Sequence, residues 1–285
     1  MNKEKSAGNK IGFYASHTIL FILLLVGAVI MLFPFFWMIS GSLKTLQEIQ
    51  SPDIVWWPEK AQWSNFYTVL TMKTNPFGVY FKNSIIVSVM NTVFTLITTI
   101  LAAFAFSKLE FRGRDKLFSL LLGTMMVPSQ MYLITNFITI TKMGLIDNLW
   151  AQIIPYTASI FYIYLLRQFF NQIPNQLYLA AKVDGCSDWK YLWTIMVPNA
   201  KSSLVTIGLF NFIASWNAYL WPMLVSNSID KRVLSTGLQY FAGDAGVEYH
   251  LMMAGATIVV VPLILIYLCF QKYIIQGIAR GGLKG

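Results

Sequence analysis

Residues 18–39 have the sequence TILFILLLVGAVIMLFPFFWMI, a run without a charged side chain. A helix needs about 20 mostly apolar residues to cross a hydrocarbon core of about 30 Å. This run is longer than the roughly 7–15 apolar residues of a signal peptide, and no cleavage site of the A-x-A kind follows it. We therefore predict an uncleaved first membrane span, preceded by a cytoplasmic segment, residues 1–17.

Five further runs have the same character. They are approximately Asn83–Ser107, Phe118–Ile140, Leu149–Phe169, Leu204–Val225 and Leu251–Phe270. Several contain proline, which membrane helices tolerate where neighbouring groups bond the carbonyl that proline leaves free. The sequence thus predicts an all-α integral membrane protein with six transmembrane helices within residues 18–273, and a cytoplasmic tail, residues 274–285.

The composition agrees with a membrane protein. Of 285 residues, 56% are hydrophobic and 12% are charged, with a mean hydropathy of +0.58. Soluble domains carry about 25% charged residues, so the composition excludes a soluble enzyme, a disordered chain and a disulfide-rich secreted domain. The net charge of +9 comes from residues in the polar gaps between apolar runs, which favours a role in topology over nucleic-acid binding.

The basic residues predict the orientation of the chain. If both termini are cytoplasmic, 14 of the 21 Lys and Arg residues lie on the cytoplasmic side, as the positive-inside rule requires. Residues 44–82 then form an external loop, and residues 170–203 a cytoplasmic one. The basic stretch 108–116 is interpreted as a positive-inside anchor.

Few residues in the spans suit catalysis or ion coupling. His17 and His250 lie near span ends, and the sequence has no metalloprotease, nucleophile-elbow or nucleotide-binding motif. Cys186 and Cys269 form no metal-binding pair. No charged residue lies near a span centre, where ion-coupled carriers usually place one. A membrane-embedded enzyme and a stand-alone carrier are therefore the weaker hypotheses; counterflow by the chain alone would indicate a carrier.

The cytoplasmic segment 170–203 is longer than a turn requires. Pro174 suits the first turn of a helix and Gly185 suits its C-terminal stop. Ser187 or Asp188 can cap a second helix that runs to about Val197, just before Pro198. We predict two short helices joined by a sharp corner on the cytoplasmic surface.

Ala180 and Ala181 give the first of these helices a face of small side chains, which another protein could approach closely. The alternative interpretation is an interfacial hairpin without a partner. The pattern Ala180-Ala181-x-x-Asp184-Gly185, followed thirteen residues later by Pro198, resembles the EAA loop of ABC importer permeases. Three further features resemble the carbohydrate-uptake branch of that family: Leu166–Phe170 with Ile173-Pro174, Ser215–Pro222, and the tail Gly277–Gly285. The last is similar to the ending of maltose-type and glycerol-phosphate-type permeases, and the resemblance covers the chain from about Ile30.

The resemblance implies a type I ABC importer permease in a bacterial cytoplasmic membrane. It implies a heterodimer with a second permease, two ATPase subunits or domains, and an extracytoplasmic solute-binding protein. ATP and Mg would bind the ATPase, with no cofactor on this chain. The coupling helix and its corner would comprise Leu177, Tyr178, Leu179, Ala180, Ala181, Asp184 and Gly185. The family's glutamate is replaced here by Leu179, so docking would rely more on apolar contact.

The implied function is translocation of a sugar or oligosaccharide by an ATP-driven, binding-protein-dependent importer. The alternative is an importer of glycerol-3-phosphate or a related polyol or phosphodiester. An anionic solute favours a cationic pocket, and no mid-membrane Arg or Lys is present, although the partner permease could supply one.

Sugars are held by aromatic faces and by convergent amide or hydroxyl groups. The candidates on the third to fifth spans are Tyr132, Asn136, Gln152, Tyr156, Asn211, Trp216, Asn217 and Tyr219. The alternative role for each is helix packing or interfacial anchoring. In the external loop, Trp56-Trp57-Pro58, Trp63–Phe66 and Tyr67 could dock the binding protein or lie on the outer leaflet.

Overall fold

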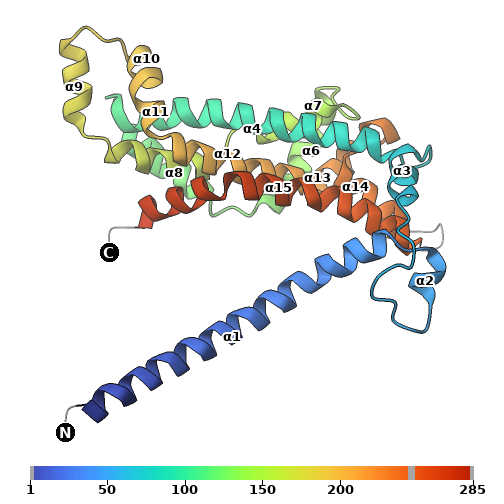
Figure 1. Ribbon diagram of the computed structural model, residues 1–285. Helices are drawn as coiled ribbons and strands as arrows, with labels where there is room; N and C mark the ends of the chain where they lie inside the picture. Colours follow the sequence, from blue (N-terminus) through green and yellow to red (C-terminus); the bar gives the residue numbers. More distant parts are fainter. Residues whose placement is uncertain (1–2, 243–247, 283–285) are drawn as a thin grey trace. The chain divides into compact units, whose positions relative to one another are not determined.

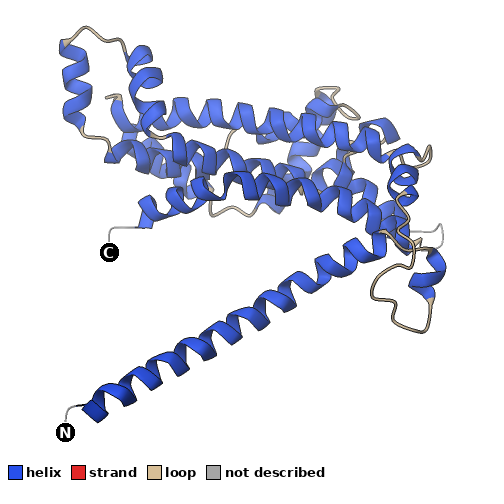
Figure 2. Cartoon of the chain, in the orientation of Figure 1, coloured by secondary structure: helices blue, strands red, loops and turns tan. Residues whose placement is uncertain are grey.

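The computed structural model describes the backbone of residues 3–242 and 248–282. Throughout these residues the chain forms helices and loops, with no strand (Figure 2), which confirms the all-α prediction. The chain divides into two compact units, Met1–Val69 with Phe241–Ile258 and Leu70–Tyr240 with Val259–Gly285.

The first unit is built on one long helix. It contains α1 (Lys3–Ser42), α2 (Leu46–Gln50), most of α3 (Ser64–Thr71) and the start of α15 (Tyr249–Gly282). The part of α1 from His17 to Ser42 has a mean hydropathy of 3.0, which suits a membrane span. Thr45 and Glu48 form a capping box that starts α2 directly after it.

The second unit contains the remaining helices around α4, which packs against α8 and α12 (Figure 1). Its helices are α4 (Phe77–Lys108), α5 (Arg114–Thr124), α6 (Leu133–Lys142), α7 (Leu149–Ile153), α8 (Ile160–Gln172), α9 (Asn175–Val183), α10 (Asp188–Tyr191), α11 (Val197–Asn199), α12 (Lys201–Trp216), α13 (Leu220–Val225) and α14 (Leu234–Leu238). A π-helical turn, Leu192–Met196, joins α10 to α11.

The described residues contain three single helices long and apolar enough to cross a membrane: His17–Ser42, Phe77–Lys108 and Tyr249–Tyr273. Two bent pairs raise the number to five if each is one span. They are Arg114–Thr124 with Ser129–Lys142, bent by 90°, and Leu149–Tyr156 with Ile160–Gln172, bent by 46°. The six-span count stays a prediction, because the expected fifth span, Leu204–Val225, is interrupted between α12 and α13.

Proline explains two of these interruptions. A proline lacks the N–H that would bond the carbonyl four residues earlier. Pro155 leaves the carbonyl of Ala151 free, and Trp221 Nε1 donates to it at 2.9 Å. Pro222 leaves the carbonyl of Ala218 free, and Ser235 Oγ donates to it at 2.5 Å. Neighbouring segments thus bond the freed groups, as a membrane interior requires.

Candidate functional site

The segment predicted to carry two short helices forms what we call the elbow, residues 174–191. Pro174 caps α9, and Gly185 ends it with a φ of +72°. Ser187 Oγ then accepts a hydrogen bond from the Lys190 amide at 3.3 Å and starts α10. The corner and a short helix on each side of it are confirmed, because each depends on local chemistry that these residues supply. The expected end of the second helix before Pro198 is wrong: α10 ends at Tyr191, and helical turns continue through Leu192–Met196 and Val197–Asn199, which includes Pro198.

Three side chains brace the elbow from within. Tyr178 Oη donates to Asp188 Oδ1 at 2.6 Å, and Lys182 Nζ lies 2.7 Å from the same oxygen. The hydrogen bonds from Lys182 and Tyr178 lower the pKa of Asp188 below its ordinary value. A group with a lowered folded-state pKa stabilises the fold above its unfolded pKa and loses that effect as pH falls through the lowered one. The contacts of Tyr178 and Lys182 with the Asp188 carboxylate therefore persist at neutral pH and are lost only in acid.

One face of α9 carries two exposed apolar side chains, one turn apart. Leu179 is 61% exposed and Val183 89%, whereas Leu177, 50% exposed, lies on the side of the helix that also carries Ala181. Exposed apolar side chains gathered on one element mark an interaction surface. The expectation that Ala181 belongs to this approachable face is wrong: it is 9% exposed and packs inward, because it lies on the opposite side of the helix from Leu179 and Val183.

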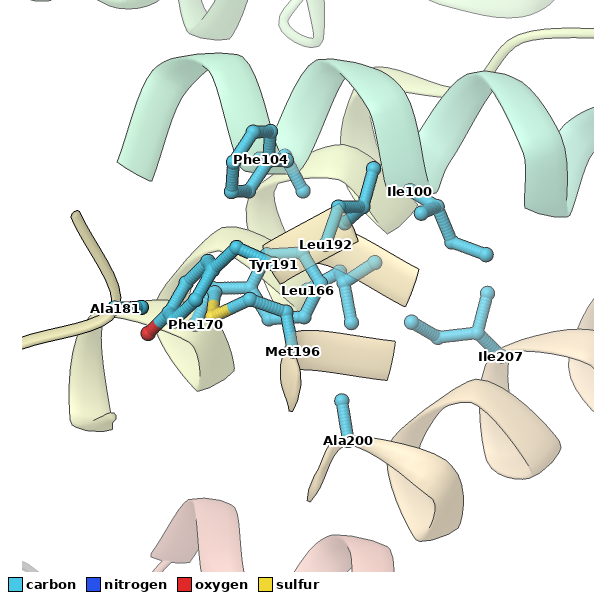
Figure 3. Close-up of a cluster of buried hydrophobic side chains, with 11 residues drawn as sticks. Ile100, Phe104, Leu166, Phe170, Ala181, Tyr191, Leu192, Met196, Ala200 and Ile207 are labelled. Carbon is cyan, nitrogen blue, oxygen red and sulfur yellow. The ribbon is translucent and has the colours of Figure 1, made fainter. Parts of the chain in front are cut away.

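The elbow packs against three helices of the second unit, α4, α8 and α12. Figure 3 shows Ala181 and Tyr191, one from each arm, in a single buried cluster with Phe104 of α4 and Phe170 of α8. The cluster is completed by Ile100, Ala103, Leu166, Leu192, Met196, Ala200 and Ile207. A displacement of α9 therefore acts directly on α4, α8 and α12.

Lys108, at the end of α4, holds the start of the elbow. Its Nζ donates to the carbonyl of Ile173 and to Oδ1 of Asn175, both at 2.8 Å, and the residue is buried. The charge of Lys108 is thus directed into the fold, while the interpretation of residues 108–116 as a positive-inside anchor stays a prediction. The proximity of residues 108 and 173 comes from helix packing, which the sequence does not reveal.

A cavity of about 350 Å³ lies in the second unit between α4, α7, α12 and α13. This volume falls within the range of ligand sites, about 300–1,000 Å³. Four predicted residues line it: Gln152, Tyr156, Asn211 and Tyr219. Tyr132 lines an adjoining cavity, together with Tyr156 and Asn211.

The other predicted solute contacts are not in these walls. Trp216 is 2% exposed, packs against Phe81 and Phe212, and donates its indole N–H to the carbonyl of Val259 at 3.1 Å. Its ring and its N–H are therefore used in packing, and its assignment to the solute path stays a prediction. Asn217 caps the end of α12, and the half-buried Asn136 lines neither cavity.

Asn91 of α4 is a wall residue that the sequence reasoning missed. It is 4% exposed, and its Nδ2 donates to Ser215 Oγ at 3.0 Å and to the backbone carbonyl of Gln152 at 3.4 Å. A buried amide within an apolar span was a visible signal. The predicted solute contacts all lie on the third to fifth predicted spans, whereas Asn91 lies on the second, Asn83–Ser107.

The described part of the chain holds no group of three or more His, Cys, Asp or Glu side chains placed to bind a metal. The cavity offers amides, hydroxyls and aromatic rings, which can hold a solute but do not form a catalytic set.

The chain belongs to the family described as "Binding-protein-dependent transport system inner membrane component", which matches residues 98–280. It is 34% identical over 271 residues to the trehalose/maltose transport system permease protein MalG of Thermococcus litoralis, covering 93% of this chain and 97% of the relative. It is 30% identical to the arabinooligosaccharides transport system permease protein AraQ of Bacillus subtilis, covering 94% and 95% of the two chains.

Its fold matches a chain in the crystal structure of a bacterial ABC transporter involved in the import of the acidic polysaccharide alginate. The TM-score is 0.83, the identity is 27%, and the match covers 91% of this chain and 96% of the other. The chain is therefore a membrane permease component of a binding-protein-dependent ABC importer. It is not an enzyme, since ATP hydrolysis belongs to a separate ATPase.

Proposed function

We propose that the chain is one of two permease subunits that import a neutral sugar or oligosaccharide at the expense of ATP. The second permease, two ATPase subunits or domains and an external solute-binding protein would complete the assembly, with ATP and Mg on the ATPase. The names of the relatives support a sugar. Among the described residues that line the 350 Å³ cavity, none is Lys or Arg, so glycerol-3-phosphate is not favoured.

The observation that carries this proposal is the exposed apolar face of α9. The other side of the elbow packs in one buried cluster with α4, α8 and α12. An ATPase that binds this face can move the bundle, because the elbow transmits force through packed side chains rather than through a loose loop. Rigid-body movement about such an interface is a common form of switching. The orientation follows: both termini and the elbow are cytoplasmic.

We expect Val183→Asp to prevent binding of the ATPase and to abolish uptake. Val183 is 89% exposed, so a carboxylate there costs nothing in the free permease but is desolvated when the apolar face is covered. Co-purification of the ATPase with the tagged permease measures binding. Val183→Ile, which keeps the apolar surface, is the matched control. Normal ATPase recovery with Val183→Asp would remove α9 from the interface.

The external loop offers a test of the membrane position. Residues Trp56 and Trp57 lie against the outer end of α1, at ring-centroid distances of 6.2 Å from Phe33 and Phe36, respectively. Ser40 Oγ donates to the carbonyl of Trp56 at 2.5 Å, and Lys44 Nζ donates to the carbonyl of Val55. Because Phe33 and Phe36 belong to the apolar part of α1, these tryptophans are at the level of an interfacial aromatic belt.

We therefore expect Trp56 and Trp57 to contact the outer leaflet rather than the binding protein. In proteoliposomes with lipids brominated near the headgroup, replacing both by phenylalanine should remove a quenched part of the tryptophan emission. Trp63→Phe is the control, since Trp63 is 69% exposed and its ring contacts Phe66 in a tilted arrangement, at a centroid distance of 6.1 Å. Equal quenching before and after the double replacement would contradict the interfacial position.

A further inference from the structure

A second hollow of the second unit, a groove of about 680 Å³, lies apart from the cavity described above. Its walls come from α11, α12 and α15, with one side chain of α4. Lys201 carries the only polar side chain in its described lining. Both α4 and α15 contain segments long and apolar enough to cross a membrane, so the groove belongs to the part of the chain that meets lipid.

The groove is a fixed feature of the fold, because its walls are held by contacts that the described residues make. Leu96 of α4, Val197 of α11 and Leu204 of α12 line the groove and also pack against the buried cluster that joins the elbow to the bundle. Thr206 Oγ1 donates to the carbonyl of Tyr273 at 3.1 Å, which holds α12 beside α15. The groove and the elbow therefore share one set of packed side chains.

Lys201 places a positive charge at the end of the groove where α12 begins. The residue is exposed, and no ion pair within the described part of the chain involves it. A lysine can lie along an apolar surface while its ammonium group stays in a polar environment. A basic residue beside an apolar groove between membrane helices suits an anionic lipid, whose phosphate and acyl chain match the two parts of the site.

Two tryptophans indicate the depth of this end of the groove. Trp189 is 63% exposed and Trp193 38%, and their rings contact each other at a centroid distance of 5.7 Å. Val197, which lines the groove, follows Trp193 by four residues. Exposed tryptophans are enriched at the level of lipid headgroups. The pair therefore places the Lys201 end of the groove near the headgroups and the rest of the groove toward the hydrocarbon.

We propose that the groove binds one anionic phospholipid. An acyl chain lies along the apolar walls, against Phe270, and the phosphate accepts hydrogen bonds from Lys201 Nζ. The occupant is a phospholipid and not a helix of another subunit, because the single polar group of the described lining is an unpaired cation at one end, where a phosphate supplies the opposite charge. The bound lipid stabilises the packing through which the elbow acts on the bundle.

The first experiment measures lipid retention by native mass spectrometry of the purified complete transporter. Added phosphatidylglycerol should be retained severalfold more than phosphatidylcholine, which has no net charge, and Lys201→Gln should abolish this preference. Lys142→Gln is the matched control, because Lys142 is an exposed lysine at the end of α6, outside the groove; it should keep the preference. Equal retention of the two lipids by the unmodified transporter, or an unchanged preference in Lys201→Gln, would overturn the proposal.

The second experiment identifies the occupant by photo-crosslinking. Phe270, which lines the groove and is 39% exposed, is replaced by p-benzoylphenylalanine in the complete transporter, reconstituted in vesicles of phosphatidylglycerol and phosphatidylcholine. Irradiation should give adducts with phosphatidylglycerol in excess of its share in the vesicles. The same replacement of Tyr267, 50% exposed on α15 and outside the groove, should show no such excess. An adduct between position 270 and another subunit, or no excess of phosphatidylglycerol there, would overturn the proposal.

Discussion

Gly185→Val is expected to abolish solute uptake while the ATPases continue to hydrolyse ATP. Gly185 has a φ of +72°, a conformation that costs an L-residue roughly 1–2 kcal/mol and is least tolerated by a β-branched side chain. An added Cβ meets nothing within 4 Å, so the effect is one of backbone conformation and not of crowding. The corner between α9 and α10 should open, and the ATPase would then move α9 without moving the bundle.

Two controls make this prediction specific. Gly185→Asn should retain most uptake, because asparagine tolerates the left-handed conformation. Gly113→Val changes a glycine with a φ of +85° and equal free space that lies outside the elbow. It should leave the ratio of uptake to ATP hydrolysis near normal. The measurement is that ratio in proteoliposomes containing the complete transporter; equal uncoupling by both valine variants would contradict the role of the corner.

Ala181→Arg is expected to displace α9 from the bundle and to reduce uptake at least tenfold. Ala181 is 9% exposed and packs within the cluster of Phe170 and Tyr191. Overpacking a buried site costs about 1–3 kcal/mol, and a surface element is stabilised by only part of the global free energy of unfolding. The small side chain thus keeps α9 against the core.

Limited proteolysis distinguishes displacement from a lost contact. Ala181→Arg should make the elbow sensitive to cleavage in the permease alone. Ala180→Arg changes the exposed neighbouring position. It should leave the elbow resistant to proteolysis and lower only the amount of ATPase that co-purifies with the permease. If both variants are equally resistant, Ala181 does not hold α9 in place.

The sequence predicted the elbow well because its features are local. Pro174, Gly185 and Ser187 each act on the few residues around them, and the structure places all three as expected. The spans were predicted less well. The hydropathy pattern predicts continuous helices through Pro155 and Pro222. Both prolines instead coincide with interruptions whose free carbonyls are bonded by Trp221 and Ser235, which lie in other segments of the chain.

The candidate site was only partly predictable for the same reason. Gln152, Tyr156 and Asn211 converge on one cavity, as residue chemistry suggested. Trp216 has the same chemistry but is used in a bond to Val259, 43 residues away along the chain. Residue type indicates what a side chain can bind, whereas tertiary packing determines whether it is still available to do so.

The shared core of the elbow has a consequence for the stoichiometry of transport. Both arms of the elbow insert into one cluster with α4, α8 and α12, so neither arm can respond to the ATPase while the other stays behind. Close-packed interiors switch between discrete arrangements instead of deforming gradually. In the proposed assembly each closure of the ATPase would therefore produce one complete conformational change of the permease, and the number of solute molecules carried per catalytic cycle should stay constant as the ATP concentration falls.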